Sequence, residues 1–252
     1  MVESRRLEQL QVEPRPDVIS ARLADLNSHN YVGDAVLGGI DGCVTTFAVV
    51  AGAVGAGFPS AVTIILGFAN LFADGFSMAI SNYQNTKSQR ELVEEARHTE
   101  ERHIDVIPEG EREEIRQIFA RKGFEGDVLD TIVTVITQDR RLWVDTMLTE
   151  ELGLAVVGPK PWRAALATFV AFFVVGLVPL VPFLLPGLTA EQRIMSSTVA
   201  TAIAFFAIGA AKGWVLQRSQ KRAGLETFLV GGAAALLAYF VGWWLHWAFG
   251  VA

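Results

Sequence analysis

Polar side chains recur at every fourth position in one apolar stretch of the sequence, FANLFADGFSMAISN (residues 68–82). The residues at this spacing are Asn70, Asp74, Met78 and Asn82. In a helix they share one face. A carboxylate inside a bilayer is costly and generally points into a helix bundle or a water-filled path. We therefore expect a polar ligand to bind or pass at this face.

A second polar stripe lies in the preceding apolar stretch, where Asp34, Asp41 and Thr45 fall seven and four residues apart on one helix face. Carboxylate and amide oxygens suit hard cations, and the thioether of Met78 adds affinity for softer transition metals. The two stripes together offer a mixed ligand set. The alternative is that the Asp residues stabilise kinks or pair with Arg, and that Met78 fills a gap in the packing.

A dense charged segment follows the second stripe. Its candidate metal ligands are His98, Glu100, Glu101, His103, Glu111, Glu113, Glu114, Glu150 and Glu151. Glu100 and His103 are three residues apart, and so are Glu111 and Glu114. Groups at this spacing lie on one side of a helix and can share a metal ion. For any single Glu the alternative is a solvated helix face stabilised by pairs with Arg.

The Glu-x-x-His pattern occurs twice, as EARH and EERH, on one expected helix. The two copies are five residues apart, about 140° around the helix axis. Helical di-iron sites need such motifs on facing helices. A ferroxidase is therefore only a third interpretation, and we do not expect the protein to be an enzyme.

The composition places these residues in a membrane protein. The chain is 51% hydrophobic and 19% charged, and the charges are segregated from long apolar stretches. A bilayer core of about 30 Å needs about 20 apolar residues in a helix. Five spans are expected, at about 31–58, 59–83, 162–185, 194–216 and 225–249. The predicted fold is an all-α integral membrane protein with five transmembrane helices and a cytosolic three-helix metal-binding domain between spans two and three.

This fold divides the chain into four parts. They are a cytosolic N-terminal segment (1–30), transmembrane helices one and two (31–84), the cytosolic helical metal-binding domain (85–161) and transmembrane helices three to five (162–252). The first domain helix should continue directly from span two. The second should end at Gly123, and the third should break near 138–140.

The distribution of Lys and Arg predicts the orientation. The loop between spans four and five holds Lys212, Arg218, Lys221 and Arg222, whereas the loop between spans three and four holds only Arg193. Because short basic loops stay in the cytosol, the N-terminus and the charged domain are expected there and the C-terminus outside. We expect a prokaryotic inner membrane and no nucleic-acid partner. The single Cys43 excludes an internal disulfide and a multi-cysteine metal site.

Small residues in span one suggest close helix packing. Gly38 and Gly42 are four residues apart, and Gly52 adds another point of close approach. Such a face permits tight helix contact in membranes. We therefore expect this face of span one to support a homodimer.

Four stretches together resemble the vacuolar iron transporter family, which exports cytosolic Fe²⁺ and often Mn²⁺ in exchange for protons. They are DAVLGGIDGCVTTFAVVAG, ADGFSMAISNY, PEGEREEIRQIFARKGF and MLTEELGL. The resemblance implies a homodimer with a transport path between the protomers, lined by spans one and two. Asp41 matches the family's pore aspartate and Met78 its pore methionine.

The resemblance also implies roles for residues of the charged domain. Glu100, Glu111, Glu114 and Glu151 match metal-binding glutamates, and Met147 matches a metal-proximal methionine. His103 stands where some members have a glutamate and can still bind a metal. Asn70 stands where some members have an acidic pore residue, so proton coupling either passes to Asp74, one turn away, or is weaker. Asp34 is a further candidate for the pore lining.

The sequence thus predicts a homodimeric exporter of Fe²⁺, Mn²⁺ or both, coupled to protons, with the metal as transported ion and no tightly bound cofactor. The alternative is a membrane-anchored metal-binding or sensing module without transport. The same oxygen, imidazole and thioether ligands serve iron and manganese, so the choice between them stays open. The number of ions bound by each cytosolic domain stays open as well.

Overall fold

The computed structural model describes residues 15–25 and 30–250, and within these residues it is helical with no β-strand. The chain forms two compact units. We call residues Thr86–Pro159 the charged unit and residues Asn30–Asn85 with Lys160–Ala252 the spanning unit. The expected N-terminal segment, residues 1–30, lies largely outside the described residues, which there include α2 (Pro16–Asp25).

Within the residues that the structure describes, five helices are long and apolar enough to cross a membrane. They are α3 (Val32–Gly55), α4 (Ser60–Val106), the segment Pro161–Leu184, α10 (Ala190–Val215) and α11 (Gln220–Phe249). Their large apolar side chains are widely exposed; Ile65 and Leu237, for example, are 67% and 68% exposed. Exposed apolar surface of this extent on long helices is that of a lipid-facing bundle. The prediction of an all-α integral membrane protein with five spans is confirmed.

Prolines end the regular helix of the third span. Helix α8 (Pro161–Gly176) gives way to the 3₁₀ turn η2 (Val178–Leu180) and the short α9 (Val181–Leu184). Pro179 and Pro182 lack the N–H that a continuing helix would need. The resulting bend is held to the bundle by Ser197, whose hydroxyl donates a hydrogen bond of 2.7 Å to the carbonyl of Pro179.

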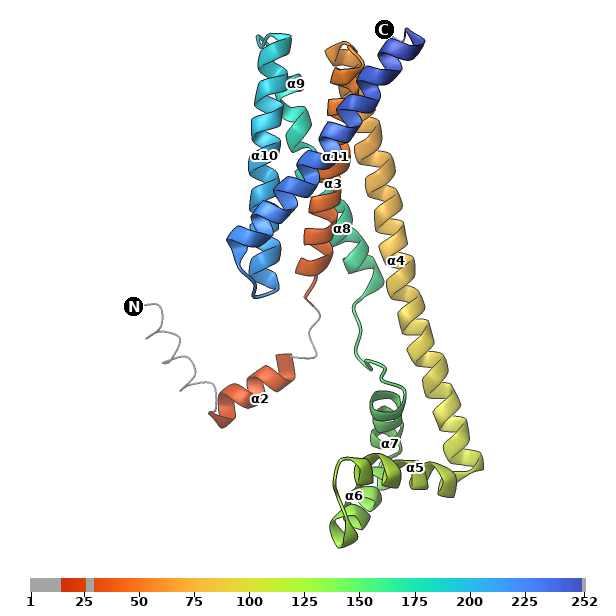
Figure 1. The fold of residues 1–252 in the computed structure, drawn as a ribbon. Helices are drawn as coiled ribbons and strands as arrows, with labels where there is room; N and C mark the ends of the chain where they lie inside the picture. Colours follow the sequence, from red (N-terminus) through yellow and green to blue (C-terminus); the bar gives the residue numbers. More distant parts are fainter. Residues whose placement is uncertain (1–14, 26–29, 251–252) are drawn as a thin grey trace. The chain divides into compact units, whose positions relative to one another are not determined.

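The glycines of α3 bring its backbone against other helices of the same chain. A Cβ at Gly38 or Gly42 would strike the backbone of Thr168 or Phe172 in α8, and one at Gly55 would strike Tyr239 in α11. Figure 1 shows α3 in the spanning unit, with α10 and α11 among its neighbours. The expectation that this glycine face supports a homodimer is wrong, because α8 and α11 occupy it.

The charged unit contains the part of α4 from Thr86 onward, followed by α5 (Pro108–Arg121), α6 (Gly126–Gln138) and α7 (Arg140–Thr146). Gly123 follows α5 with φ of 93°, a conformation that favours glycine. The expected break near 138–140 occurs at Asp139, whose carboxylate accepts hydrogen bonds from the backbone N–H groups of Arg141 and Leu142. Helix α4 runs on from the second span without interruption, as predicted.

The last turn of this unit is wider than an α-helix. Residues Met147–Glu151 form the π-helical turn η1. Met147 and Leu148 are fully buried there, in a core with Ile115, Val133 and Val144. This core joins α5, α6, α7 and η1 to the end of α4, so it fixes the helices that carry the charged side chains.

Candidate metal-binding sites

Glu100, His103 and Glu111 form a group that we call the acidic cluster. Glu100 and His103 lie one turn apart on α4, and Glu111 lies in the first turn of α5. Helix α4 ends before Pro108, which has no N–H and begins α5 as its first residue. The backbone N–H of Glu111 donates to the carbonyl of Ile107 within this tight connection. The sequence thus folds Glu111 back toward the face of α4 that carries the other two residues.

The three side chains of the acidic cluster converge. One carboxylate oxygen from each Glu and one ring nitrogen of His103 all lie within 4.8 Å of one another. His103 Nδ1 is 3.3 Å from Glu111 Oε1. Glu111 is 1% exposed and Glu100 5%, whereas His103 is open to solvent. The cluster is therefore a buried pair of carboxylates with an accessible imidazole.

Each buried carboxylate keeps one oxygen without a hydrogen bond. Glu100 Oε2 and Glu111 Oε2 are inaccessible and have no partner among the residues that the structure describes. A buried oxygen of this kind is costly unless it binds something. A divalent cation would satisfy both oxygens, and carboxylate with imidazole is a ligand set for Mn²⁺, Fe²⁺ and other first-row metals.

The acidic cluster is also strained electrostatically. Burial first, and then the negative charges of Glu114, Glu100 and Glu151, together raise the pKa of Glu111 to about 7. The pKa of Glu151 is raised by burial and then by Glu114 and Glu100, while His103 acts in the opposite sense. Carboxylates that repel one another in this way bind a cation more strongly than separate carboxylates do.

Glu114, Glu151 and Met147 surround the cluster in different ways. Glu114 and Glu151 are exposed, yet both charges act on Glu111. Met147 is fully buried in the hydrophobic core at the start of η1. The π turn carries both Met147 and Glu151, and such single wide turns are frequent at functional sites.

The other candidate ligands of the charged unit form surface ion pairs. His98 lies 3.5 Å from Glu94 and 3.7 Å from Glu101. Glu113 pairs with Arg116, and Glu150 with Lys122. For these residues the solvated charged face is the correct interpretation. The structure thereby separates Glu100, His103 and Glu111 from the many charges around them.

In the spanning unit the polar stripes meet through amide hydrogen bonds. Asn70 Nδ2 donates to the hydroxyl oxygens of Thr45 and Thr46, at 3.3 and 3.2 Å. Asn82 Nδ2 donates to Asp34 Oδ1 at 2.9 Å and to Thr168 Oγ1 at 2.8 Å. These bonds tie α4 to α3 and α8 near both ends of the stripe.

The three remaining stripe residues are less enclosed. Asp41 is partly buried, Asp74 is exposed on the surface of the single chain, and their charges repel each other. Met78 is partly buried against an apolar cluster that includes Leu71 and Phe172. Within one chain the two stripes therefore bring Asp41 and Asp74 near each other, with Asp74 on an apolar outer surface.

The acidic cluster and the two polar stripes lie in a region of the sequence that matches known proteins. A profile described as the VIT family matches residues 32–243, which include the acidic cluster and both stripes. The chain belongs to the VIT family. This membership confirms the resemblance that the four sequence stretches indicated.

Named members of the VIT family are similar over most of their length. The chain is 32% identical to "Vacuolar iron transporter" of Toxoplasma gondii over 224 residues, which are 85% of this chain and 74% of that protein. It is 28% identical to "Vacuolar iron transporter 1" of Arabidopsis thaliana over 94% of this chain and 96% of that protein. With "Vacuolar iron transporter 1" of Tulipa gesneriana the identity is 32%, over 83% and 85%.

Two threonines complete the polar network of this VIT-family chain and were missed from the sequence. Thr46 and Thr168 are fully buried and accept the amide hydrogen bonds of Asn70 and Asn82. Thr168 also donates to the carbonyl of Ala164, four residues earlier in α8. The available signal was a hydroxyl in the middle of an apolar span, but Thr often bonds its own helix and so gives no partner.

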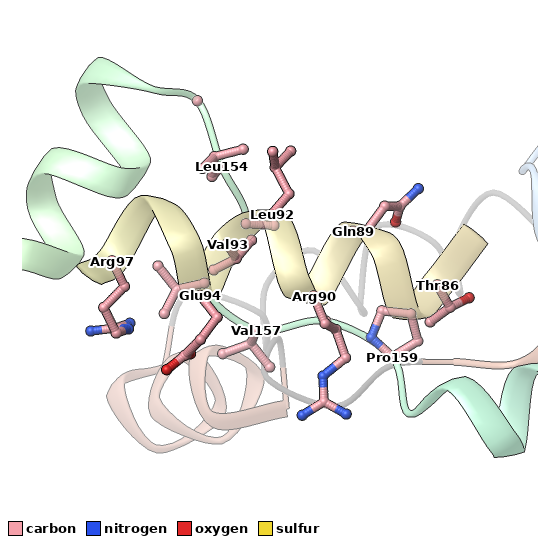
Figure 2. A pocket seen from close by; sticks show the side chains of 14 residues that line it. Thr86, Gln89, Arg90, Leu92, Val93, Glu94, Arg97, Leu154, Val157 and Pro159 are labelled. Atoms are coloured by element: carbon pink, nitrogen blue, oxygen red, sulfur yellow. The ribbon is translucent and has the colours of Figure 1, made fainter. Parts of the chain in front are cut away.

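A pocket of about 610 Å³ lies elsewhere in the charged unit and contains none of the predicted ligands. It opens between α4 and the non-helical segment that leads from Gly153 to Pro159. Figure 2 shows Arg90, Glu94 and Arg97 on one side of α4, the side on which Val157 lies. Arg97 is held by Asp145 at 2.6 Å. The pocket is distinct from the acidic cluster and takes no part in its ligand set.

Proposed function

We propose that this VIT-family chain is a transporter that exports Fe²⁺, Mn²⁺ or both in exchange for protons. The observation that carries the proposal is the acidic cluster, in which two buried carboxylates each keep a free oxygen beside an imidazole. The relatives named as vacuolar iron transporters support iron as a substrate. Five spanning helices supply the membrane part that a transporter needs.

In this proposal the acidic cluster collects the ion before it enters the membrane. The charged unit lies in the cytosol, because the basic loop between α10 and α11 marks the cytosolic side. Glu100, His103 and Glu111 hold the metal, with Glu114 and Glu151 adding negative charge. Met147 supports the cluster from the core. Because the ligands must lose protons to bind, the cluster loads best near neutral or higher pH.

The spanning unit passes the ion along the two polar stripes. Asp41 and Met78 contact the metal, and Asp34 lies at the same end of the stripe as Asn82, its hydrogen-bond partner. Asp74 supplies the acidic group that Asn70 cannot, since an amide does not titrate. Protons entering from outside compete for the two carboxylates, release the metal and reset the carrier.

The exposed position of Asp74 supports a homodimer. A carboxylate on a lipid-facing surface is unfavourable, and a second copy that covers this face of α4 would remove it from lipid. The ion path then runs between the two copies. The contact involves α4 and not the glycines of α3, which pack inside the chain.

Uptake into proteoliposomes tests the transport proposal. Purified protein is reconstituted, Mn²⁺ or Fe²⁺ is added outside under anaerobic conditions, and a pH gradient is imposed. Wild type is expected to accumulate metal with the gradient. Asp41→Ala should transport about ten-fold more slowly or worse, which corresponds to a barrier raised by about 1.4 kcal/mol when a ligand of the path is lost. Ser77→Ala, an exposed site on α4, is the matched control. Wild-type uptake by Asp41→Ala would show that the path assignment is wrong.

The second candidate function is a membrane-anchored metal-binding or sensing module. It is favoured by the completeness of the acidic cluster within the charged unit, which needs no residue of the spanning unit to bind metal. It predicts metal binding without gradient-dependent uptake. The same proteoliposomes decide between the two, because bound and internal metal are separated by washing with an impermeant chelator.

A further inference from the structure

A hollow of about 550 Å³ lies in the spanning unit where α10 ends and α11 begins. Its lining includes Asn30, Trp214, Gln217, Arg218 and Gln220. Residues 216–219 join two consecutive spanning helices, so the hollow lies at a membrane surface. Figure 1 shows this connection at the end of the α10 and α11 pair. None of the residues of the acidic cluster or the stripes contributes to it.

The backbone around the hollow is closely packed and hydrogen-bonded. A Cβ at Gly213 would meet the side chain of Ala223 at 2.9 Å, so α10 and α11 are in backbone-close contact there. The backbone N–H of Arg218 donates to the carbonyl of Gly213 at 2.8 Å. Gln217 has φ of 51° and is the one non-glycine residue with positive φ among the described residues. This position at a helix end usually holds glycine, and such backbone strain is found where ligands bind.

Basic residues are concentrated in the connection that forms the hollow. Arg218 lines the hollow, and Lys212, Lys221 and Arg222 lie within two residues of other lining residues in the sequence. None of the four has an ion pair or a side-chain hydrogen bond within the described part of the chain. In the charged unit, by contrast, Arg97, Arg116 and Arg140 are each paired with an Asp. Four cations without carboxylate partners favour an anionic ligand from outside the chain.

The apolar surroundings indicate that this ligand is a lipid. Trp214 is 67% exposed beside the hollow, and exposed Trp at a membrane surface lies at the level of the headgroups. Leu225 and Leu229 of α11 are 53% and 59% exposed further along. If the phosphate of a lipid lies in the hollow, its acyl chains can therefore extend along an apolar helix face. A free phosphate would use only the cations.

We propose that this hollow binds the headgroup of an anionic phospholipid, with Arg218 contacting the phosphate and Trp214 packing against the glycerol region. Basic pockets between spanning helices bind lipid headgroups by the same chemistry. The alternative is that the four cations only set the orientation of the chain, which requires no bound lipid. The proposal concerns lipid and not the transported ion, so it stands or fails separately from the transport function.

Native mass spectrometry of the delipidated full-length protein tests the proposal. Phosphatidylglycerol and phosphatidylcholine with the same acyl chains are titrated separately. Wild type is expected to retain phosphatidylglycerol selectively. Arg218→Gln should weaken that binding roughly five-fold, the effect of one cation at a membrane surface, and Arg218→Lys should restore most of it. Arg193→Gln, at the other end of α10, is the matched control and should bind as wild type does.

Three results would overturn the proposal. They are equal retention of the two lipids, unchanged phosphatidylglycerol binding by Arg218→Gln, and displacement of the lipid by an equal concentration of inorganic phosphate. The last result would identify a site for soluble anions. Arg218 is exposed and three basic residues remain in the variant, so neither folding nor orientation should change.

Discussion

The acidic cluster and the polar stripes both bring acidic side chains together, but they differ in what surrounds the carboxylates. Glu100 and Glu111 are buried, and a tight turn between two helices brings them together. Asp41 and Asp74 lie on neighbouring spans, and Asp74 is exposed on an apolar surface. A site that must hold an ion tightly benefits from a complete, buried ligand set. A site that must release the ion benefits from groups that remain open to protons and to a second chain.

The largest effect is expected when one ligand of the acidic cluster is removed. Glu111→Gln is expected to weaken Mn²⁺ binding by the full-length protein about 100-fold, since even indirect changes around metals cost ten- to hundred-fold. Glu113 lies two residues further along α5 and pairs with Arg116 on the surface, so Glu113→Gln should change the affinity less than two-fold. Isothermal titration in detergent measures both. A similar loss in the two variants would mean that overall negative charge, and not the cluster, binds the metal.

The Glu111→Gln variant also shows whether Glu111 acts as a metal ligand or stabilises the fold. Because Glu111 is buried with an unpartnered oxygen and a raised pKa, its charge destabilises the metal-free fold. Metal-free Glu111→Gln should therefore melt at the same temperature as wild type or a higher one at pH 8. A clear fall in melting temperature would indicate that Glu111 stabilises the fold and would weaken its assignment as a ligand.

A glycine substitution tests whether the two regions are independent. Gly42→Ala places a methyl group against the backbone of Phe172, and overpacking of this kind costs about 1–3 kcal/mol. In Gly67→Ala the new methyl meets the flexible end of Leu180, so the cost should be smaller. Thermal unfolding in detergent should rank the variants in this order. Mn²⁺ affinity should stay unchanged in both, and a loss of affinity would show that the cluster depends on the packing of the spans.

The pH dependence of the wild type sharpens the description of the cluster without any substitution. The pKa of Glu111 rises from 4.5 to about 7 on folding. Its neutral form is favoured by the fold, so the contribution of Glu111 to metal-free stability should be fully present below pH 4.5 and be lost as the pH rises to about 7. Metal binding needs the charged form, so affinity should rise about ten-fold per pH unit up to pH 7 and then level off. Affinity that does not change between pH 5.5 and 7 would contradict this assignment.

Structural features that depend on a local sequence signal were predicted correctly. The length of α4, the break at Asp139 and the turn at Gly123 follow from apolar periodicity, an N-cap and a glycine. The contact of Asn82 with Asp34 was indicated less directly, by two polar stripes in adjacent spans. In each case residues close in sequence, or in consecutive helices, determine the result.

Features that depend on distant packing were not predictable. Nothing in MLTEE marks the π turn, because its one wide turn depends on the core around Met147 and Leu148. The glycines of α3 signalled a close contact without saying which helix makes it. The spacing paired Glu100 with His103 and, separately, Glu111 with Glu114. Only the fold brings Glu111 to the first pair and separates this trio from the paired charges of Glu101 and Glu113.

The glycines also divide the spanning helices into two mechanical classes. Helix α3 is locked to α8 and α11 through backbone contacts, and α10 is locked to α11 in the same way at Gly209. Helix α4 meets its neighbours through side chains instead, as Gly67 meets Leu180 and Gly75 meets Phe172. Side chains can change rotamer whereas backbones in contact cannot move without separating. In the transport cycle that we propose, α3, α8, α10 and α11 would form the static frame, and α4, with Asp74 and Met78, would be the element that moves against it.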